Sequence, residues 1–360
     1  MHKQHLIIDA QFGSTGKGLY AGYLARQIQC DTIAYSPSPN AGHTLLWRGH
    51  SFIHKMLPSG ITSPMLQKIV LGPGSLIDLD RLHAELCGIF ESLPRFRDIK
   101  IFVHKHAACV YDRHRQAEAQ GGTAPGSTRQ GVGAAQRERI LRSPAQNNVI
   151  GNADHPVLRL VHLVDTVTMQ QIYGESQVLL VESCQGYSLS MYHGQYPYTT
   201  CRDVTAASIM ADTGVPMGRV LPIVHGTFRT YPIRVANRPE SGEWSGPSYS
   251  DSAEITFESI GQQQELTTVT KLPRRLFTWS QRQAIEACTQ NRISVGFLNF
   301  AQYPIKFSHL IDIWEQLNEC TQVKYLGFGP DIEDVYRVGS PSLEIHRITK
   351  IYERYRGAAT

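Results

Sequence analysis

The sequence contains no run of eighteen consecutive apolar residues, so we expect no membrane-spanning helix and no membrane partner. Its seven cysteines are odd in number and widely spaced, and no C-x-x-C pair occurs among them. Only three clearly apolar residues precede Asp9, which is too short a stretch for a secretory signal. Together these absences predict a reduced protein of the cytoplasm.

An excess of charge of one sign is also lacking. Charged residues make up 18% of the chain, and the formal net charge is only +4. This balance is too mild for a protein that binds nucleic acid directly, but it is compatible with an anionic small molecule as substrate. Hydrophobic residues make up 41%, which excludes a disordered chain, and 360 residues are enough to bury a large core.

The opening residues predict the first unit of an α/β fold. His5–Ala10 has the composition of a buried strand, a glycine-rich loop follows it, and Leu19–Ile28 has the apolar spacing of a helix. Further apolar runs at 68–71, 99–103, 178–181 and 295–298 are typical of strands that are buried on both faces. We therefore expect a single domain over residues 1–360, built around a mostly parallel central sheet.

Two stretches interrupt this pattern. Residues 120–133 are rich in Gly, Ser, Thr and Gln, which indicates a mobile loop. Residues 235–252 contain Pro239, Gly242, Gly246, Pro247 and several serines, which predicts a long surface connection within one domain.

The glycine-rich loop reads Gly13-Ser14-Thr15-Gly16-Lys17-Gly18. It is not a Walker A motif, because only two residues separate its first two glycines, and it is not G-x-G-x-x-G. Small residues would still let backbone N–H groups approach a phosphate, beside a lysine charge and a helix N-terminus. The alternative is a tight strand-to-helix turn with a solvated lysine, and the loop alone does not decide between the two.

Two further clusters contain polar residues that could meet a nucleotide. The first is Asn40-Ala41-Gly42-His43-Thr44, which is followed by Leu57-Pro58-Ser59-Gly60-Ile61. The second is Glu182-Ser183-Cys184-Gln185-Gly186, which is followed by the segment from His193 to Thr200. A lone histidine is more often structural than functional, and the second cluster could be no more than an ordered loop with a Tyr-Pro-Tyr turn.

Taken together, these stretches closely resemble the adenylosuccinate synthetase family. The family's Q-W-G-D-E-G-K-G stands here as Gln11–Gly18, and its N-A-G-H-T and L-P-S-G-I are unchanged. Its E-G-A-Q-G and H-G-T-Y-P-Y-x-T match residues 182–186 and 193–200. Weaker matches continue at 126–128, 268–275 and 329–331, so that the resemblance spans nearly the whole chain. It implies the family's α/β fold, which is related to the P-loop NTPases, and a C–N-forming ligase that acts as a homodimer with Mg²⁺.

The resemblance also implies roles for individual residues. Catalytic roles fall to Ser14, Lys17, His43 and Gln185. The donor nucleotide would be bound by Gly13, Ser14, Thr15, Gly16, Lys17, Gly18, Gly42, His43, Thr44, Gln302, Gly329 and Pro330. The acceptor nucleotide would be bound by Ser14, Asn40, Ser127, Thr128, Gln185, Thr200 and, from a second subunit, Arg142. L-aspartate would be bound by Thr268, Val269, Thr270 and Arg274, and Mg²⁺ by Ser14 and Gly42.

One departure from the family pattern falls at the catalytic loop. In the family, the Asp of G-D-E-G-K-G removes the N1 proton of hypoxanthine and touches the metal, but here this position is Ser14. A serine hydroxyl cannot act as a carboxylate-like base near neutral pH, and it is a weaker metal ligand. Serine is also smaller and uncharged, which leaves room beside purine N1 and C2, where guanine carries an amino group.

The second departure falls at the residues that read the donor base. The family's T-K-x-D uses its Asp to accept two hydrogen bonds from guanine, whereas here the matching positions are Phe300 and Gln302. A neutral amide donates and accepts at once, which complements adenine. Phe300 could stack on the base. We therefore expect ATP or dATP as the donor.

Both departures resemble a phage branch of the family, the 2-aminoadenylosuccinate synthetases, which join L-aspartate to dGMP and use ATP. If a phage encodes the chain, the expected cytoplasm is that of its host. The alternatives are an ordinary adenylosuccinate synthetase, which uses IMP and GTP, and a non-catalytic nucleotide-binding relative. N1 deprotonation without the Asp could use a water relay through Ser14, another group, or the substrate's own phosphate.

Overall fold

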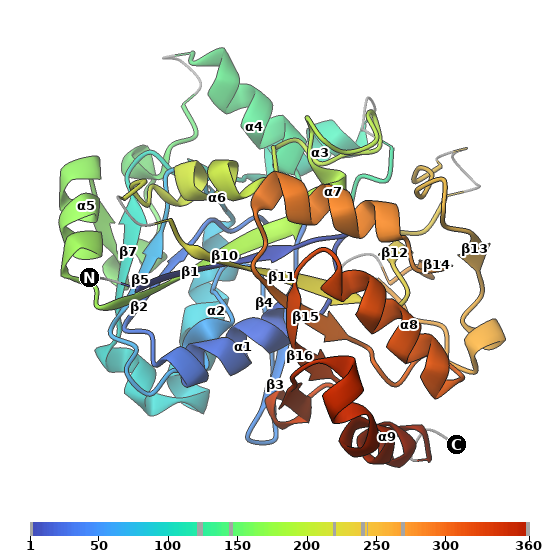
Figure 1. Cartoon of the computed structure of the whole chain (residues 1–360). Coiled ribbons are helices and arrows are strands. Elements are labelled where there is room, and N and C mark those ends of the chain that lie inside the picture. The colour runs from blue at the N-terminus through green and yellow to red at the C-terminus, as the bar shows by residue number, and fades with distance from the viewer. Residues whose placement is uncertain are drawn as a thin grey trace.

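The structure is a computed structural model that describes residues 3–120, 125–143, 147–218, 221–238, 242, 244–267 and 271–357. Within these residues, ten strands form one central sheet in the order β17-β16-β15-β11-β1-β10-β2-β5-β7-β9 (Figure 1). The strands of this sheet are β1 (Lys3–Asp9), β2 (Thr32–Tyr35), β5 (Lys68–Leu71), β7 (Lys100–His104), β9 (His162–Val164), β10 (Val178–Gly186), β11 (Ile223–Arg229), β15 (Val295–Asn299), β16 (Gln322–Gly327) and β17 (Val335–Arg337). Every neighbouring pair is parallel except β16 and β17, which confirms the mostly parallel sheet.

Helices cover both faces of this sheet (Figure 1). They are α1 (Lys17–Ile28), α2 (Leu79–Ser92), α3 (Asp112–Ala119), α4 (Val132–Leu141), α5 (Thr166–Glu175), α6 (Ala206–Thr213), α7 (Gln281–Asn291), α8 (Phe307–Asn318) and α9 (Pro341–Gly357). Smaller sheets are formed by β3 (His43–Trp47) with β4 (His50–His54), β6 (Leu76–Ile77) with β8 (Ala108–Cys109), and β14 (Arg275–Phe277) with β12 (Ile233–Arg234) and β13 (Glu254–Ile255). No described helix has both the length and the apolar composition to cross a membrane.

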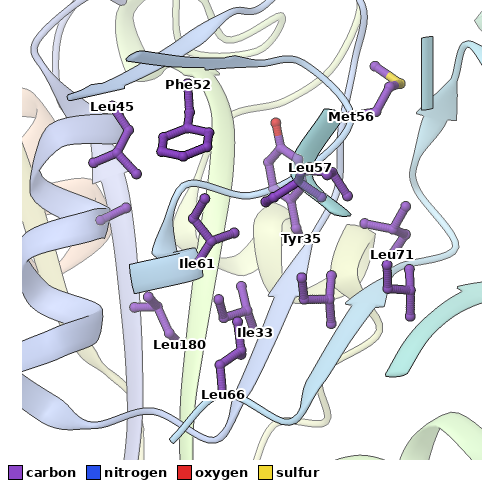
Figure 2. Packing of buried hydrophobic residues seen from close by; sticks show 14 of the residues in the cluster. Ile33, Tyr35, Leu45, Phe52, Met56, Leu57, Ile61, Leu66, Leu71 and Leu180 are labelled. Carbon is purple, nitrogen blue, oxygen red and sulfur yellow. The ribbon is translucent and has the colours of Figure 1, made fainter. Parts of the chain in front are cut away.

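The core forms as two layers, one on each face of the sheet. Along β1, Ile7 packs in the layer under α1 and α2, whereas Leu6 and Ile8 pack in the layer under α5 to α9. This alternation follows from the two-residue period of a strand that is covered on both faces. Figure 2 shows part of the first layer, where Ile33 of β2 and Leu180 of β10 meet Ile61 below the β3–β4 hairpin.

The strand order places a switch point at β1. From β1 the chain moves outward through β2, β5, β7 and β9, returns to β10 beside β1, and then builds the other half through β11, β15 and β16. At such a point the connections leave opposite faces of the sheet, and the carboxyl ends of the strands border a crevice where ligands bind. The glycine-rich loop after β1 and residues 182–186 at the end of β10 therefore meet there.

The described residues of the 235–252 stretch form no helix or strand and are mostly at least partly exposed, as their composition predicts, but part of the stretch packs against the protein. Ser245 and Tyr249 are buried. The cause is Arg234, whose guanidinium donates to the carbonyls of Ser245 and Pro247 and so draws this segment onto the protein. In the 120–133 stretch, described residues 125–131 form a loop, but α4 already begins at Val132.

Candidate active site

A cavity of about 890 Å³ lies at the switch point, and residues of the three motifs line it together. This volume lies within the range typical of sites for small ligands and cofactors. The predicted site residues on its wall are Gly13, Ser14, Gly16, Lys17, Gly18, Asn40, Gly42, His43, Thr44, Ser127, Thr128, Gln185, Thr200 and Arg274. The structure thus brings together groups that lie up to about 260 residues apart in the chain.

Asp9, at the carboxyl end of β1, shapes the glycine-rich loop. Its buried carboxylate accepts hydrogen bonds from the backbone N–H groups of Gln11, Gly13 and Thr15, and one from the Thr15 hydroxyl. Burial raises the pKa of Asp9, while these bonds and the charge of Lys17 oppose the rise. At the end of the loop, Gly16 has φ = +82°, and a side chain there would collide with Asn299.

Lys17 connects the glycine-rich loop to both other motifs. Its Nζ atom lies 2.6 Å from the Nε2 atom of His43 and 2.6 Å from the carbonyl oxygen of Ser183. A lysine ammonium can only donate, so His43 accepts through Nε2, and its Nδ1 proton faces the Tyr35 hydroxyl at 3.5 Å. Burial lowers the pKa of Lys17, and burial together with the Lys17 charge lowers the pKa of His43 well below its ordinary value.

Glu182 connects the third motif to the segment that follows the second. Its fully buried carboxylate accepts hydrogen bonds from the backbone N–H groups of Ser59 (2.9 Å) and Gly60 (2.7 Å). Burial raises the pKa of this carboxyl, and the two N–H groups oppose the rise. Glu182 thereby fastens the Leu57–Ile61 segment, which follows the β3–β4 hairpin, beneath the site.

Gln185 and Asn40 form an ordered pair of amides on the cavity wall. The Asn40 Oδ1 atom accepts hydrogen bonds from Gln185 Nε2 at 2.7 Å and from Ser38 Oγ at 2.6 Å. The Asn40 amide nitrogen is therefore directed to donate elsewhere, and the Gln185 carbonyl oxygen remains an acceptor. Gln185 also has φ = +68°, an uncommon conformation for a residue with a side chain.

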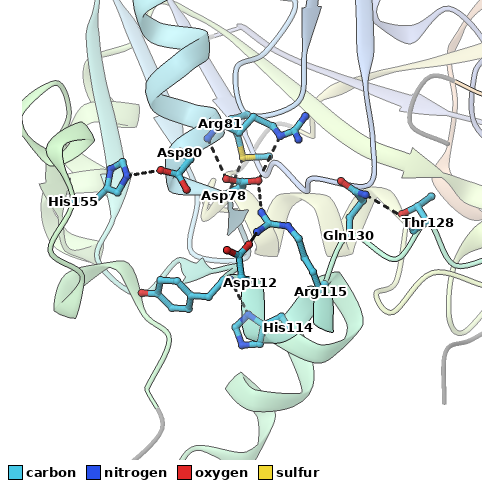
Figure 3. A network of polar contacts seen from close by, with 12 residues as sticks. Asp78, Asp80, Arg81, Asp112, His114, Arg115, Thr128, Gln130 and His155 are labelled. Atoms are coloured by element: carbon cyan, nitrogen blue, oxygen red, sulfur yellow. Dashed lines mark hydrogen bonds and ion pairs between the residues drawn. The ribbon is translucent and has the colours of Figure 1, made fainter. Parts of the chain in front are cut away.

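The cavity wall also includes Ser127 and Thr128, on the loop between α3 and α4. Figure 3 shows how this region is fixed, with Arg115 of α3 donating at 2.6 Å to Asp78, the residue that caps α2. Glu118 of α3 accepts hydrogen bonds from the first N–H groups of α4, at Gly131 and Gly133. The 127–128 loop is therefore held between two anchored helices, and its position is set by them.

The predicted aspartate site is described only in part. Thr268, Val269 and Thr270 lie outside the described residues. Arg274 lines the cavity, and its Nη1 atom donates at 2.9 Å to Glu265. The same carboxylate accepts a hydrogen bond of 2.7 Å from Arg229, a fully buried residue at the end of β11.

Five predicted residues do not lie on the cavity wall. The first, Thr15, departs from the expected nucleotide contact, because its amide and hydroxyl are already bound to Asp9. Exposed Arg142 follows α4, next to Leu141 on the cavity rim. Gln302 lies after β15, and its Oε1 atom is buried without a partner within the described residues. Gly329 and Pro330 form a tight turn after β16, where a side chain at 329 would collide with Asp334.

Sequence reasoning missed three groups that organise the site: Asp9, Arg229 and Glu265. A carboxylate at a strand end, four residues before the first glycine of the loop, was a usable signal for Asp9. Arg229 and Glu265 carried no local signal, because they pair across 36 positions of the sequence.

Comparison with known proteins agrees with this geometry. The family model for adenylosuccinate synthetase matches residues 6–158 and 155–300. The N6-succino-2-amino-2′-deoxyadenylate synthase of Cyanophage S-2L is 50% identical, over 98% of this chain and 96% of its own length. The protein of the same name from Acinetobacter phage SH-Ab 15497 is 39% identical, over 91% of this chain and 92% of its own.

One solved structure is similar over the whole chain. It is the Cyanophage S-2L succinoaminodeoxyadenylate synthetase (PurZ) bound to dGMP and to dATP as an energy donor, with a TM-score of 0.93 and 50% identity. The match covers 99% of this chain and 100% of the other.

Proposed function

We propose that this chain, which belongs to the adenylosuccinate synthetase family, is the ligase that joins L-aspartate to C6 of dGMP with ATP or dATP as the energy donor. The product is N6-succino-2-amino-2′-deoxyadenylate, a precursor of 2-aminoadenine in DNA. The observation that carries the proposal is the match, along nearly the full length of both chains, to the Cyanophage S-2L enzyme whose structure holds dGMP and dATP. We keep the single domain over residues 1–360 and a location in the host cytoplasm as predictions.

The reaction proceeds in two steps that conserve atoms and charge. First, O6 of the guanine attacks the γ-phosphorus of the donor, and the nucleoside diphosphate (ADP or dADP) leaves as the N1 proton is lost. Second, the amine of aspartate attacks C6, and inorganic phosphate departs with the O6 oxygen. Charge builds on the transferred phosphoryl group in the first step, so catalysis depends on fixed positive and hydrogen-bonding groups around it.

Lys17 and His43 are placed to meet that charge. The Lys17 ammonium lies at the N-terminus of α1, where the helix dipole adds to its attraction for phosphate. We infer that an incoming phosphate draws Lys17 away from His43. The imidazole can then carry its proton on Nε2 and donate a hydrogen bond to the phosphoryl or O6 oxygen. Asn40, Gln185, Thr128 and Thr200 line the cavity and would bind the acceptor nucleotide, and Arg274 lines the same cavity and would bind aspartate.

The residues present fit a magnesium ion that is bound mainly by phosphates. Ser14 is exposed on the cavity wall, its hydroxyl makes no hydrogen bond within the described residues, and Gly42 lies on the same wall. Across the described residues, His, Cys, Asp and Glu side chains do not gather in groups of three that could hold a metal. Two neutral oxygen donors suit Mg²⁺, which keeps waters and nucleotide phosphates as its other ligands and would neutralise phosphate charge.

Removal of the N1 proton needs a route other than the family's Asp. Ser14 holds an exposed hydroxyl where a water relay could begin, and its small size leaves room for the guanine 2-amino group. Asp9 is a buried carboxylate at the end of the strand that precedes the loop, but it already accepts four hydrogen bonds from the segment that follows it. We therefore assign Asp9 to loop structure, and the three proposed routes stay a water relay through Ser14, another group on the cavity wall, and the substrate's own phosphate.

Gln302 supports an adenine donor. Its buried amide oxygen lacks a partner within the described residues, and such acceptors are rarely left unpaired in folded proteins. The exocyclic amine of adenine would supply the missing donor, whereas guanine presents an oxygen at that position. We also propose a homodimer in which Arg142 of a second subunit reaches the acceptor phosphate.

The test crosses acceptors with donors. IMP, GMP and dGMP are each incubated with ATP, dATP or GTP, together with aspartate and Mg²⁺, and the succinyl nucleotide is detected by mass. We expect product from dGMP with ATP or dATP. Product from IMP with GTP alone would instead identify an ordinary adenylosuccinate synthetase, and no product from any pair would identify a non-catalytic relative.

A further inference from the structure

Arg229 lies at the end of β11 with none of its side chain exposed. A buried guanidinium is costly unless it is paired, and a hydrophobic replacement of similar volume often gives a protein that is as stable. Here the pairing is incomplete, because the Arg229 Nε atom is buried without a partner within the described residues. Stability alone is therefore a poor explanation for a buried charge at this position. The contacts of Arg229 indicate a role in the active site instead.

Each contact of Arg229 leads to a different part of the active site. Its Nη1 atom donates at 3.3 Å to the backbone oxygen of Ser14, in the glycine-rich loop. Its guanidinium lies 4.0 Å from the centre of the Phe300 ring, at the proposed donor base. Both terminal nitrogens donate to Glu265, at 2.7 and 3.4 Å.

Glu265 extends these contacts to the aspartate site. Besides Arg229 it accepts hydrogen bonds from Arg274 Nη1 and from the Tyr303 hydroxyl, both at 2.9 Å. Burial alone would raise the pKa of this carboxyl, but the two guanidinium groups, chiefly Arg229, hold it at about 2. Glu265 is therefore ionised throughout the physiological range and always available to orient Arg274.

Phe300 is held in place by the same strand end. It has φ = +57°, a conformation that residues with side chains rarely adopt and keep only when their surroundings fix it. Its carbonyl oxygen accepts a 2.8 Å hydrogen bond from the Thr230 hydroxyl, next to Arg229, and the guanidinium covers its ring. A donor base that stacked on Phe300 would therefore affect the Arg229–Glu265 pair through the ring that the guanidinium covers.

We propose that the Arg229–Glu265 pair is a positioning element that couples donor binding to aspartate binding. The inference rests on the proposed function, because it assigns Phe300 to the donor base and Arg274 to aspartate. A donor base stacked on Phe300 further restrains its ring and, through it, Arg229 and Glu265, which holds Arg274 more strictly in the orientation that grips a carboxylate. Aspartate therefore binds more tightly to the enzyme that already holds its donor, and the reverse holds by linkage.

The test is calorimetric and needs no turnover. Aspartate is titrated into the full chain with dGMP and Mg²⁺, in the presence and absence of a non-hydrolysable ATP analogue. In the wild type we expect the analogue to tighten aspartate binding about tenfold, and in Glu265→Gln this factor falls to about one. Because Gln keeps the shape of Glu, binding of the analogue alone should change less than about threefold.

The neighbouring ion pair of Arg275 with Glu254 supplies the control. Arg275 is paired as closely, at 2.6 and 2.8 Å, but Glu254 is half-exposed and touches none of the proposed subsites. Glu254→Gln should therefore keep the wild-type factor. If Glu265→Gln does not fold, Tyr303→Phe removes only one hydrogen bond to Glu265 and should reduce the factor in part.

The outcomes separate the two proposals. An unchanged factor in Glu265→Gln or in Tyr303→Phe overturns the coupling role, even if aspartate binds more weakly to both forms. A wild type that fails to bind the ATP analogue at all overturns the proposed donor, and the coupling with it.

Discussion

The Thr15 hydroxyl donates a 2.6 Å hydrogen bond to the Asp9 carboxylate, and this contact ties the glycine-rich loop to the strand that precedes it. The same hydroxyl lies 2.5 Å from that of Thr227 on β11, so three segments meet at one buried point. The Asp9 carboxylate thereby fixes the backbone conformation of the loop before any phosphate binds.

Replacing Asp9 with Asn tests this role. The amide would turn N–H donors toward the N–H donors of the loop, so we expect a loss of about 2 to 3 kcal/mol in the free energy of unfolding. We also expect a KM for the donor nucleotide that rises about tenfold or more. Urea unfolding and initial-rate kinetics measure the two effects. Thr15→Ser, which keeps the hydroxyl, should stay close to the wild type, and an unaltered KM in Asp9→Asn would show that the loop does not depend on Asp9.

Much of this architecture could be predicted from local sequence. The run at 68–71 coincides with β5, and the strand, loop and helix that open the chain lie within two residues of β1 and α1. Buried parallel strands and helix starts leave local patterns, because apolar runs and glycine turns are needed wherever they occur. The motif resemblance added the fourteen predicted residues that lie on the cavity wall.

The pairing of charges that are distant in the chain could not be predicted from the sequence. Glu265 stands in a polar stretch that is typical of exposed loops, yet it is half-buried between Arg229 and Arg274. The composition of 235–252 predicted a surface connection, and only the fold reveals that Arg234 binds the carbonyls of Ser245 and Pro247. Such contacts depend on tertiary distance, which no local pattern encodes.

Ser14 is the position where we expect acceptor choice to change. In Ser14→Asp, a carboxylate would occupy the space beside purine C2, so kcat/KM for dGMP should fall at least about tenfold while that for IMP falls less or rises. Ser14→Ala keeps the space beside purine C2 but lacks the hydroxyl, so it distinguishes the effect of space from the effect of the hydroxyl group. Competition between dGMP and IMP, followed by mass spectrometry, gives the ratio directly. Unchanged dGMP turnover in Ser14→Asp would contradict the role of space.

Acid stability should depend on a buried histidine pair. The Nδ1 atom of His5 lies 3.0 Å from Nε2 of His225, whose other nitrogen lies 2.8 Å from the Tyr20 hydroxyl. Only one of the two facing ring nitrogens can carry a proton, so protonating both rings would set two N–H donors against each other. Burial, with Lys3 adding to it, lowers the pKa of His5 to about 4, and burial with His5 adding to it lowers the pKa of His225 to about 3.

The sign of the effect follows from these pKa values. Between about pH 6.5 and pH 4 the unfolded chain binds protons that the folded chain excludes, so the free energy of unfolding decreases as the pH falls through this range. His225→Gln removes one of the two groups and should make that decrease shallower in urea unfolding at pH 7, 6, 5 and 4.5. Exposed His50→Gln serves as the control and should leave the slope as it is. Parallel curves for the wild type and His225→Gln would exclude the pair as the cause.

Donor choice should depend on Gln302. Its unpaired, buried amide oxygen is suited to the adenine amine, while a carboxylate at the same place would accept the two donors of guanine. In Gln302→Asp we therefore expect the KM for ATP to rise about tenfold and GTP to become a usable donor. Met has a length similar to Gln and no comparable hydrogen-bonding group. Gln302→Met should therefore weaken ATP binding without making GTP a usable donor. The rates with each donor at saturating dGMP and aspartate give the comparison, and an ATP preference that survives in Gln302→Asp would assign base selection to Phe300 and its surroundings instead.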